Sequence, residues 1–120
     1  MANPNIVNVT SIYGKTLGAS LGTTVTTTLL TCASDKLYKI NSIIVSNIDG
    51  TDGADVTIDF YDGSNGWPLA KLVTVPAKST LIVVGKDAPI YLEESDQIRG
   101  GASAASDLDV IISYEILDDA

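Results

Sequence analysis

The chain has 120 residues, of which 45% are hydrophobic and 6% aromatic, and its formal net charge is −8. A chain of this length fits one domain with its own core, so we expect a single domain over residues 1–120, with residues 1–8 as a candidate extended N-terminal arm. The acidic charge argues against binding to nucleic acid or to anionic membranes. The sequence contains no His, and Cys32 is its single cysteine, which excludes Ser-His-Asp and Cys-His catalytic sites and any intrachain disulfide.

The N-terminus, MANPNIVNV, lacks the basic start and the apolar block of a signal peptide. No apolar run approaches the roughly twenty residues that a membrane-spanning helix needs. We therefore expect a protein that folds in a cytoplasm and does not contact a membrane. Cys32 is expected to be a small buried hydrophobic residue, because no His is present to activate it.

The first third of the chain is rich in Thr and Gly. Its alternation over residues 5–32 predicts three strands, and the run Thr23–Thr28 predicts a polar edge strand. The next segment, KLYKINSIIVSNID, predicts a strand with partly covered faces, in which Ile40, Ile44 and Ile48 share one face.

The middle of the chain alternates apolar and polar residues between Gly-rich turns. In ADVTIDFYD, the residues Val56, Ile58 and Phe60 are expected to face a core, which is typical of a half-solvated antiparallel strand. The turn segments DGTDG and DGSNG favour hairpin connections. Pro68 and Pro76 bracket a predicted short strand and indicate either an edge strand or a strand boundary, and residues 81–84 predict a buried strand.

The last segment, DLDVIISYEIL, predicts the clearest strand. One face would carry five core residues: Leu108, Val110, Ile112, Tyr114 and Ile116. The opposite face is of mixed polarity and could contact a partner or another part of the chain. No segment shows helical periodicity with caps. The sequence therefore predicts an all-β fold, an antiparallel β-sandwich or jelly roll of eight to ten short strands.

Two acidic clusters are the most chemically suggestive features. Asp49, Asp52 and Asp55 could point oxygens at a calcium ion, but their spacing does not match an EF-hand loop, and a solvated hairpin turn is the favoured interpretation. Residues 93–96 include Glu93, Glu94 and Asp96, which could serve acid–base catalysis of the glycosidase kind. Because we expect them in a solvated turn without an apolar pocket, we assign them no catalytic role.

Trp67 beside Pro68, with Tyr61 nearby, could stack on a carbohydrate, but we favour a role for Trp67 in capping one end of the core. Arg99 precedes two glycines and is interpreted as a surface charge. The sequence lacks phosphate-binding Gly loops and zinc-type Cys clusters. We therefore name no catalytic, cofactor-binding or metal-binding residue, and we predict that the protein is not an enzyme.

Two stretches of the chain resemble small virion structural proteins of tailed bacteriophages, especially those of marine cyanophages. One combines NIVNVTSIYGKT with KLYKINSIIVSNIDGTDGADVTIDFYD, and the other is PIYLEESDQIRGGASAASDLDVIISYEIL. The second is similar to a recurring phage module in which a strand, an acidic turn and a short strand lead to a final long strand that closes with Tyr-Glu.

This resemblance implies a non-enzymatic virion protein that binds the major capsid protein or other virion proteins. A capsid cement or decoration protein, assembled in the host cytoplasm and forming a homotrimer, is the favoured expectation. A neck, tail, baseplate or fibre-anchoring component is the alternative. A carbohydrate-binding module is more remote, because it would need several exposed aromatic residues on one face.

Overall fold

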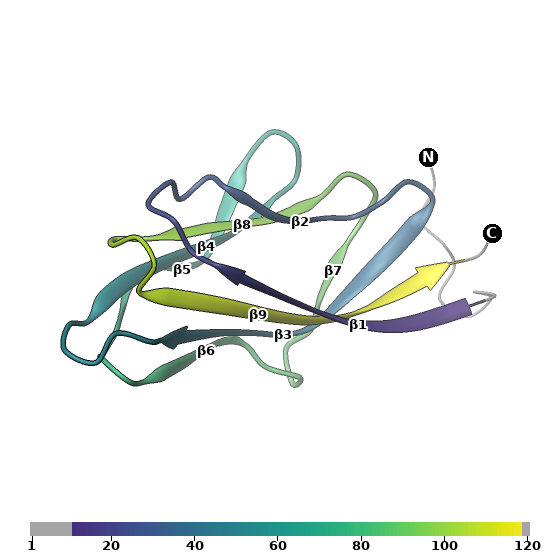
Figure 1. Ribbon diagram of the computed structural model, residues 1–120. Helices are drawn as coiled ribbons and strands as arrows, with labels where there is room; N and C mark the ends of the chain where they lie inside the picture. Colours follow the sequence, from purple (N-terminus) through teal and green to yellow (C-terminus); the bar gives the residue numbers. More distant parts are fainter. Residues whose placement is uncertain (1–10, 119–120) are drawn as a thin grey trace.

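The computed structural model describes residues 11–118, which form two antiparallel sheets packed face to face (Figure 1). This confirms the predicted all-β sandwich and the predicted number of strands. The strands within this range are β1 (Ser11–Ser20), β2 (Thr28–Thr31), β3 (Lys36–Asn47), β4 (Ala54–Tyr61), β5 (Gly66–Val75), β6 (Thr80–Val84), β7 (Ile90–Leu92), β8 (Gln97–Ala102) and β9 (Leu108–Asp118). No helix in this part of the chain is long and apolar enough to cross a membrane.

Each sheet has a simple strand order. Sheet 1 runs β1-β9-β3-β6, with β7 also paired to β3, and sheet 2 runs β2-β8-β4-β5. The edges formed by β5 and β6 lie against each other, so β1 and β2 are the edge strands on the opposite side of the sandwich (Figure 1). The connections β1–β2, β2–β3 and β3–β4 each lead from one sheet to the other.

The core lies between the sheets and is built mainly from Ile, Leu and Val. In β9, the predicted core face is confirmed, because Leu108, Val110 and Ile112 are fully buried. In β4, Val56 and Ile58 are also fully buried, while the polar residues between them are half-exposed. Burial of each such side chain stabilises the fold by about 1.5–3 kcal/mol before entropic costs.

The predicted face of β3 is wrong. Pairing with β9 slips by one residue between Ile40 and Ser42, which marks a β-bulge. The extra residue reverses the parity of the strand, so Ile40 faces the core while Ile44 faces outward and is half-exposed. Ile48 lies beyond the end of the strand and is 61% exposed.

The strand predicted as buried over residues 81–84 is instead an edge strand. β6 pairs only with β3, and its central residue, Ile82, is 64% exposed. β5 is an edge strand of sheet 2, which agrees with the edge position that the prolines indicated. Pro76 follows the strand directly, but Pro68 lies inside it and does not mark its start.

The first third of the chain differs from its prediction. The described residues of this segment form β1 and β2, and the predicted count of three strands also covers residues 5–10, which lie outside the described range. Residues 23–27 form a loop before β2 instead of an edge strand. This loop crosses β8 closely: a Cβ atom at Gly101 would lie 2.6 Å from the carbonyl oxygen of Thr24. The candidate N-terminal arm, residues 1–8, lies outside the described residues.

Candidate assembly surface

The described residues 11–118 contain no pocket that could hold a small molecule. Within the same range, no group of three or more Cys, Asp or Glu side chains is placed to hold a metal ion. This part of the chain presents exposed faces and strand edges to its surroundings.

The three aspartates considered as calcium ligands, Asp49, Asp52 and Asp55, make separate hydrogen bonds. Asp49 accepts hydrogen bonds from the backbone N–H and the hydroxyl of Thr51, both at 3.0 Å, and the backbone bond is the main cause of its lowered pKa. Asp55 accepts a hydrogen bond from the hydroxyl of Thr74 at 2.7 Å. These contacts belong to a turn and to a pair of neighbouring strands. The turn is not the hairpin that the sequence predicted, because it connects β3 of sheet 1 to β4 of sheet 2.

The second acidic cluster lies in the turn between β7 and β8, where it was expected. Glu94 accepts a 2.8 Å hydrogen bond from the backbone N–H of Asp35, and Asp96 accepts one of 3.0 Å from the backbone N–H of Glu93. Partial burial raises the pKa of Asp96. Each carboxylate thus organises a turn, and the structure does not pair the two around a cavity.

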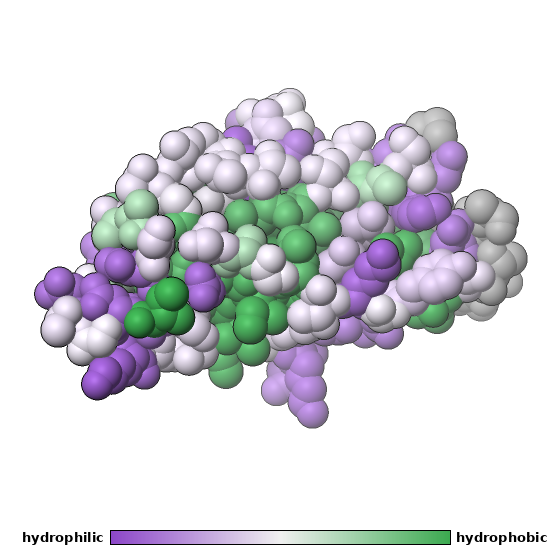
Figure 2. Space-filling view, in the orientation of Figure 1, coloured by the Kyte–Doolittle hydropathy of each residue, from purple (hydrophilic) through white to green (hydrophobic). Residues whose placement is uncertain are grey.

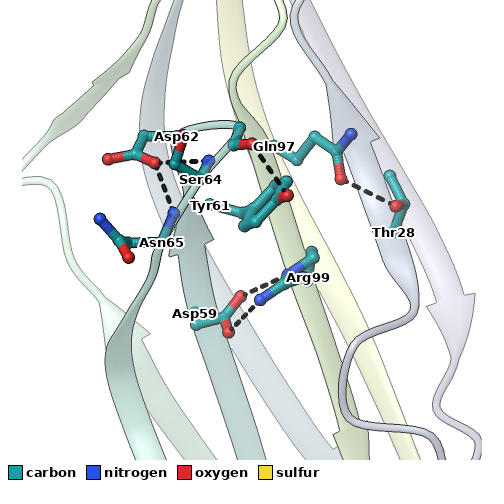
Figure 3. Close-up of polar contacts among 9 residues, drawn as sticks. Thr28, Asp59, Tyr61, Asp62, Ser64, Asn65, Gln97 and Arg99 are labelled. Carbon is teal, nitrogen blue, oxygen red and sulfur yellow. Dashed lines mark hydrogen bonds and ion pairs between the residues drawn. The ribbon is translucent and has the colours of Figure 1, made fainter.

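Trp67 does not cap the core, contrary to the sequence interpretation. The residue is 54% exposed, and its indole N–H donates a 3.1 Å hydrogen bond to Asp62. Asp62 also accepts hydrogen bonds from the backbone N–H groups of Ser64 and Asn65 in the β4–β5 turn (Figure 3). The Asn65 bond is the largest cause of the lowered pKa of Asp62, followed by the Trp67 bond.

Arg99 was interpreted from the sequence as a surface charge, and the structure corrects this interpretation. It lies in β8 and forms two hydrogen bonds to Asp59 of β4, at 3.1 and 3.0 Å (Figure 3). Its guanidinium carbon lies 3.9 Å from the ring centre of Tyr61, within the range of a cation–π contact. Hydrogen bonding to Asp59 raises the pKa of Arg99.

The position of this ion pair depends on a glycine. Gly66 begins β5, and a Cβ atom there would lie 2.6 Å from the Arg99 guanidinium and 2.7 Å from the Asp59 carboxylate. The side chains of the pair are 16% and 14% exposed, so they cover the outer face of sheet 2 near this turn. Strand parity could have suggested the contact, because Asp59 and Arg99 are direct cross-strand neighbours.

Cys32 is buried, as expected, and its thiol donates a 3.3 Å hydrogen bond to the carbonyl oxygen of Lys36. Burial raises the pKa of the thiol to about 11. The thiolate, which is the reactive form, is therefore scarce at neutral pH.

The outer face of sheet 1 is apolar at its middle, while Lys39 and Glu115 lie opposite each other further along the same face. A row of isoleucines crosses it: Ile82 of β6 and Ile111 of β9 are both direct neighbours of Ile44 of β3. We call these three residues the isoleucine row. Ile82 is 64% exposed and Ile111 is 41% exposed. The row ends at Gly18 of β1, which is paired with Ile111 and leaves open space above the strand.

Small hydroxyl side chains flank the isoleucine row on both sides. On one side, Ser46 is hydrogen-bonded to Thr80 at 3.3 Å, and on the other, Thr16 contacts Ser113 at 3.5 Å. Asp109 is the one charged residue at the registers next to the row. Depletion of charge with exposed apolar side chains is typical of the centre of a protein–protein interface.

Sequence comparisons with protein-family models and with curated proteins gave no match. Among solved structures, the fold is similar to a protein of Bacillus endospore appendages, which are described as a family of disulfide-linked pili. The TM-score is 0.55 with 17% sequence identity, and the alignment covers 92% of this chain and 88% of that one. At this identity the likeness establishes a shared fold.

A second structure is a pentameric capsid protein isolated from metagenomic phage sequences. It aligns with a TM-score of 0.41 and 19% identity, over 86% of this chain and 62% of that one. Because this TM-score is below 0.5, we infer nothing about the present chain from it.

Proposed function

We propose that the protein is a non-enzymatic virion structural protein, a capsid cement or decoration protein that binds and stabilises major capsid subunits. The resemblance of two stretches of the sequence to small phage virion proteins suggests the setting. The observation that carries the proposal is the isoleucine row on the outer face of sheet 1, because it exposes apolar side chains beside small hydroxyl groups at the middle of a broad surface.

In this proposal the isoleucine row is the centre of the contact with the capsid. Ile82 and Ile111 would lose their exposed apolar area to the partner, which favours binding. The flanking Ser and Thr hydroxyls can donate to and accept from a partner's backbone at little desolvation cost. Repetition over a lattice would let modest individual contacts add up through avidity.

The sandwich is proposed to be a jelly roll. Its strand order places β1, β9, β3 and β6 in one sheet and β2, β8, β4 and β5 in the other, and β7 is an additional short strand. Two sheets of four main strands, linked by repeated crossings between the sheets, are the arrangement of that class.

The likeness to the spore appendage protein supports an assembled structural role but not the same linkage. That protein is described as forming disulfide-linked pili. In the present sequence the single cysteine, Cys32, is buried. Association through non-covalent surfaces is therefore the proposed mode.

The test is to mix the purified protein with capsids of the parent phage that lack it and to image the particles by electron microscopy. Regular density over the head lattice is expected. Bare heads would overturn the cement proposal, and density at the neck or tail alone would favour the alternative of a neck, tail, baseplate or fibre-anchoring component.

Two variants test whether the isoleucine row makes the contact. Ile82→Glu places a charge at the row and is expected to weaken capsid binding at least tenfold. Ile48→Glu is the matched control, because Ile48 is 61% exposed, close to the 64% of Ile82, but lies beyond the end of β3. Equal binding by both variants would exclude the row as the contact surface.

The homotrimer implied by the resemblance remains a proposal. Native mass spectrometry of the free protein tests it, because a trimer has three times the 12.5 kDa mass of the chain. Binding to glycan arrays is the corresponding test of a carbohydrate-binding module, for which the exposed ring of Trp67 is the relevant residue.

A further inference from the structure

The four sheet edges of the described residues differ in how well they are protected against pairing with another strand. An edge strand presents unpaired backbone N–H and C=O groups, and proteins commonly block it with short strands, bulges, prolines or charges. β2 has four residues and a register shift. On the far side of sheet 1, β6 has five residues and β7 has three, with a turn between them.

β5 is long but is interrupted in three ways. It contains Pro68, which cannot donate to a neighbouring strand, and its pairing with β4 has two register shifts. Leu72 within it has a φ of 52°, a left-handed conformation that a straight strand does not contain. These features make β5 a poor template for a further strand.

β1 is the exception. It has ten residues, pairs with β9 without a register shift, and has no proline or bulge. No other described strand pairs with its second side. Lys15 is its one charged residue. In Figure 2, apolar atoms gather between the two sheets on this same side of the molecule, where β1 and β2 are the edges. The open edge therefore borders an apolar seam.

We propose that β1 is a self-association edge, along which two copies of this chain pair antiparallel about a two-fold axis and join their first sheets into one. The partner strand must be long and regular, and among the described edges β1 itself meets that requirement. Pairing of identical strands about a two-fold axis perpendicular to the sheet is antiparallel, and this symmetric type of contact is the commonest in homo-oligomers.

The register follows from the alternation of side chains. Opposite residues in an antiparallel pair share a face, so odd residues of β1, which face inward, must oppose odd residues. Two registers keep the largest number of residue pairs between the two β1 strands. One places the two-fold axis at Lys15 and the other places it at Thr16. The first sets the two lysines directly opposite each other, which is repulsive. The second opposes Lys15 to Leu17 and Gly14 to Gly18, so we assign the axis to Thr16.

Cross-linking tests the register. Thr16→Cys places two thiols opposite each other, with Cα atoms about 4.5–5.5 Å apart, which a disulfide can bridge. Mild oxidation should give a covalent dimer. The same treatment of Ser20→Cys alone should not, whereas Ser20→Cys mixed with Ile12→Cys should, because the register opposes these residues. Native Cys32 is buried and leaves the assay undisturbed.

A charge-pair experiment tests the edge, and thermal unfolding of each variant is its control, because Gly14 is paired with Glu115 and a Glu at position 14 repels it within the monomer. A Cβ atom at Gly14 or Gly18 has no heavy atom within 4 Å, so larger residues fit there. The double variant Gly14→Glu/Gly18→Glu sets like charges opposite each other and should raise the dimer dissociation constant at least tenfold. Gly14→Lys/Gly18→Lys should do the same, and a mixture of the two variants should restore a dimer.

Sedimentation and native mass spectrometry of the full chain provide the readout. The proposal expects a species of twice the 12.5 kDa chain mass that weakens in both double variants. It is overturned if the protein is monomeric at high concentration, if the free protein is the homotrimer considered above with no dimeric species, or if its oligomer is unaffected by those charges. Efficient cross-linking of Lys15→Cys in place of Thr16→Cys would overturn the register. Capsid binding is scored separately, so failure of the cement proposal leaves this result interpretable.

Discussion

The side-chain amide of Asn47 donates a 2.8 Å hydrogen bond to the carbonyl oxygen of Val75, and this bond joins the last residue of β3 in sheet 1 to the last residue of β5 in sheet 2. The same amide donates to the carbonyl oxygen of Asp52 at 3.1 Å, and its own oxygen accepts from the N–H of Asp49 at 2.8 Å. Asn47 is 4% exposed, so these bonds replace those that water would otherwise make.

We therefore predict that Asn47→Ala lowers the free energy of unfolding by about 1–3 kcal/mol, because two backbone carbonyls lose a partner in a buried setting. Urea denaturation measures the change. Asn65→Ala, at an exposed turn position, should change stability by less than about 0.5 kcal/mol. Equal losses from both variants would contradict a structural role specific to Asn47.

Gly101 supports a second prediction about stability. A Cβ atom there would approach the carbonyl oxygen of Thr24 to 2.6 Å and the Cα atom of Val25 to 2.9 Å, and both are backbone atoms that cannot rotate away. Gly101→Ala should therefore destabilise the fold by about 1–3 kcal/mol, as overpacking does. Gly18→Ala, where the space is open, should be neutral or slightly stabilising. Thermal unfolding of the pair distinguishes these outcomes.

The strands that sequence alone predicts well are β4 and β9. Both are paired on both sides within a sheet and present one face to the core, so apolar residues recur at every second position, although the outward face of β9 also carries Ile111 and Leu117. The bulge near Asn41 in β3 escapes prediction because no glycine or proline marks it, and one extra residue reverses every later side chain.

The candidate surfaces are less accessible to sequence reasoning. Ile44, Ile82 and Ile111 become neighbours only through the pairing registers of three strands. No local sequence pattern therefore predicts the isoleucine row. The resemblance to phage virion proteins suggested that the partner is a virion protein, but it did not indicate which face of the sandwich makes the contact. Arg99 was misinterpreted for the same reason, since its partner, Asp59, is forty residues away.

A third prediction concerns the coupling between Arg99 and Asp59. Because the pair is bidentate and largely covered, we expect a double-mutant cycle with Arg99→Met and Asp59→Asn to give a coupling energy of about 1–2 kcal/mol. Met retains an apolar stem against Tyr61. The coupling should persist in high salt, because screening acts mainly on exposed pairs. A value near zero in low salt would show that the contact contributes nothing.

Acid sensitivity of the β4–β5 turn is the fourth prediction. Hydrogen bonds from Asn65 and Trp67 lower the pKa of Asp62 in the folded state. The ionised Asp62 therefore stabilises the fold at every pH above the pKa that Asp62 has in the unfolded chain. This stabilisation is lost as the pH falls through the lower pKa that Asp62 has in the folded protein. Trp67 is the only tryptophan, so its fluorescence reports on this turn. The emission should change at a pH below the usual aspartate range of about 3.9.

Two variants identify the group responsible for that transition. Asp62→Asn should remove it, because an amide does not titrate in this range. Asp87→Asn, in the exposed turn between β6 and β7, should leave it in place. A transition that survives in Asp62→Asn would assign the acid sensitivity to another carboxylate.

The final prediction is that Cys32 is chemically inert in the folded protein. Its pKa of about 11 leaves little thiolate at pH 8, and burial denies reagents access to the sulfur. Labelling with a thiol reagent at pH 8 should therefore be slow in buffer and complete in denaturant. Thr31→Cys adds an exposed thiol at the preceding position and should be labelled rapidly once per chain. Fast labelling of native Cys32 would mean that the β2 end of the sandwich opens readily, and association would then have to be measured under reducing conditions.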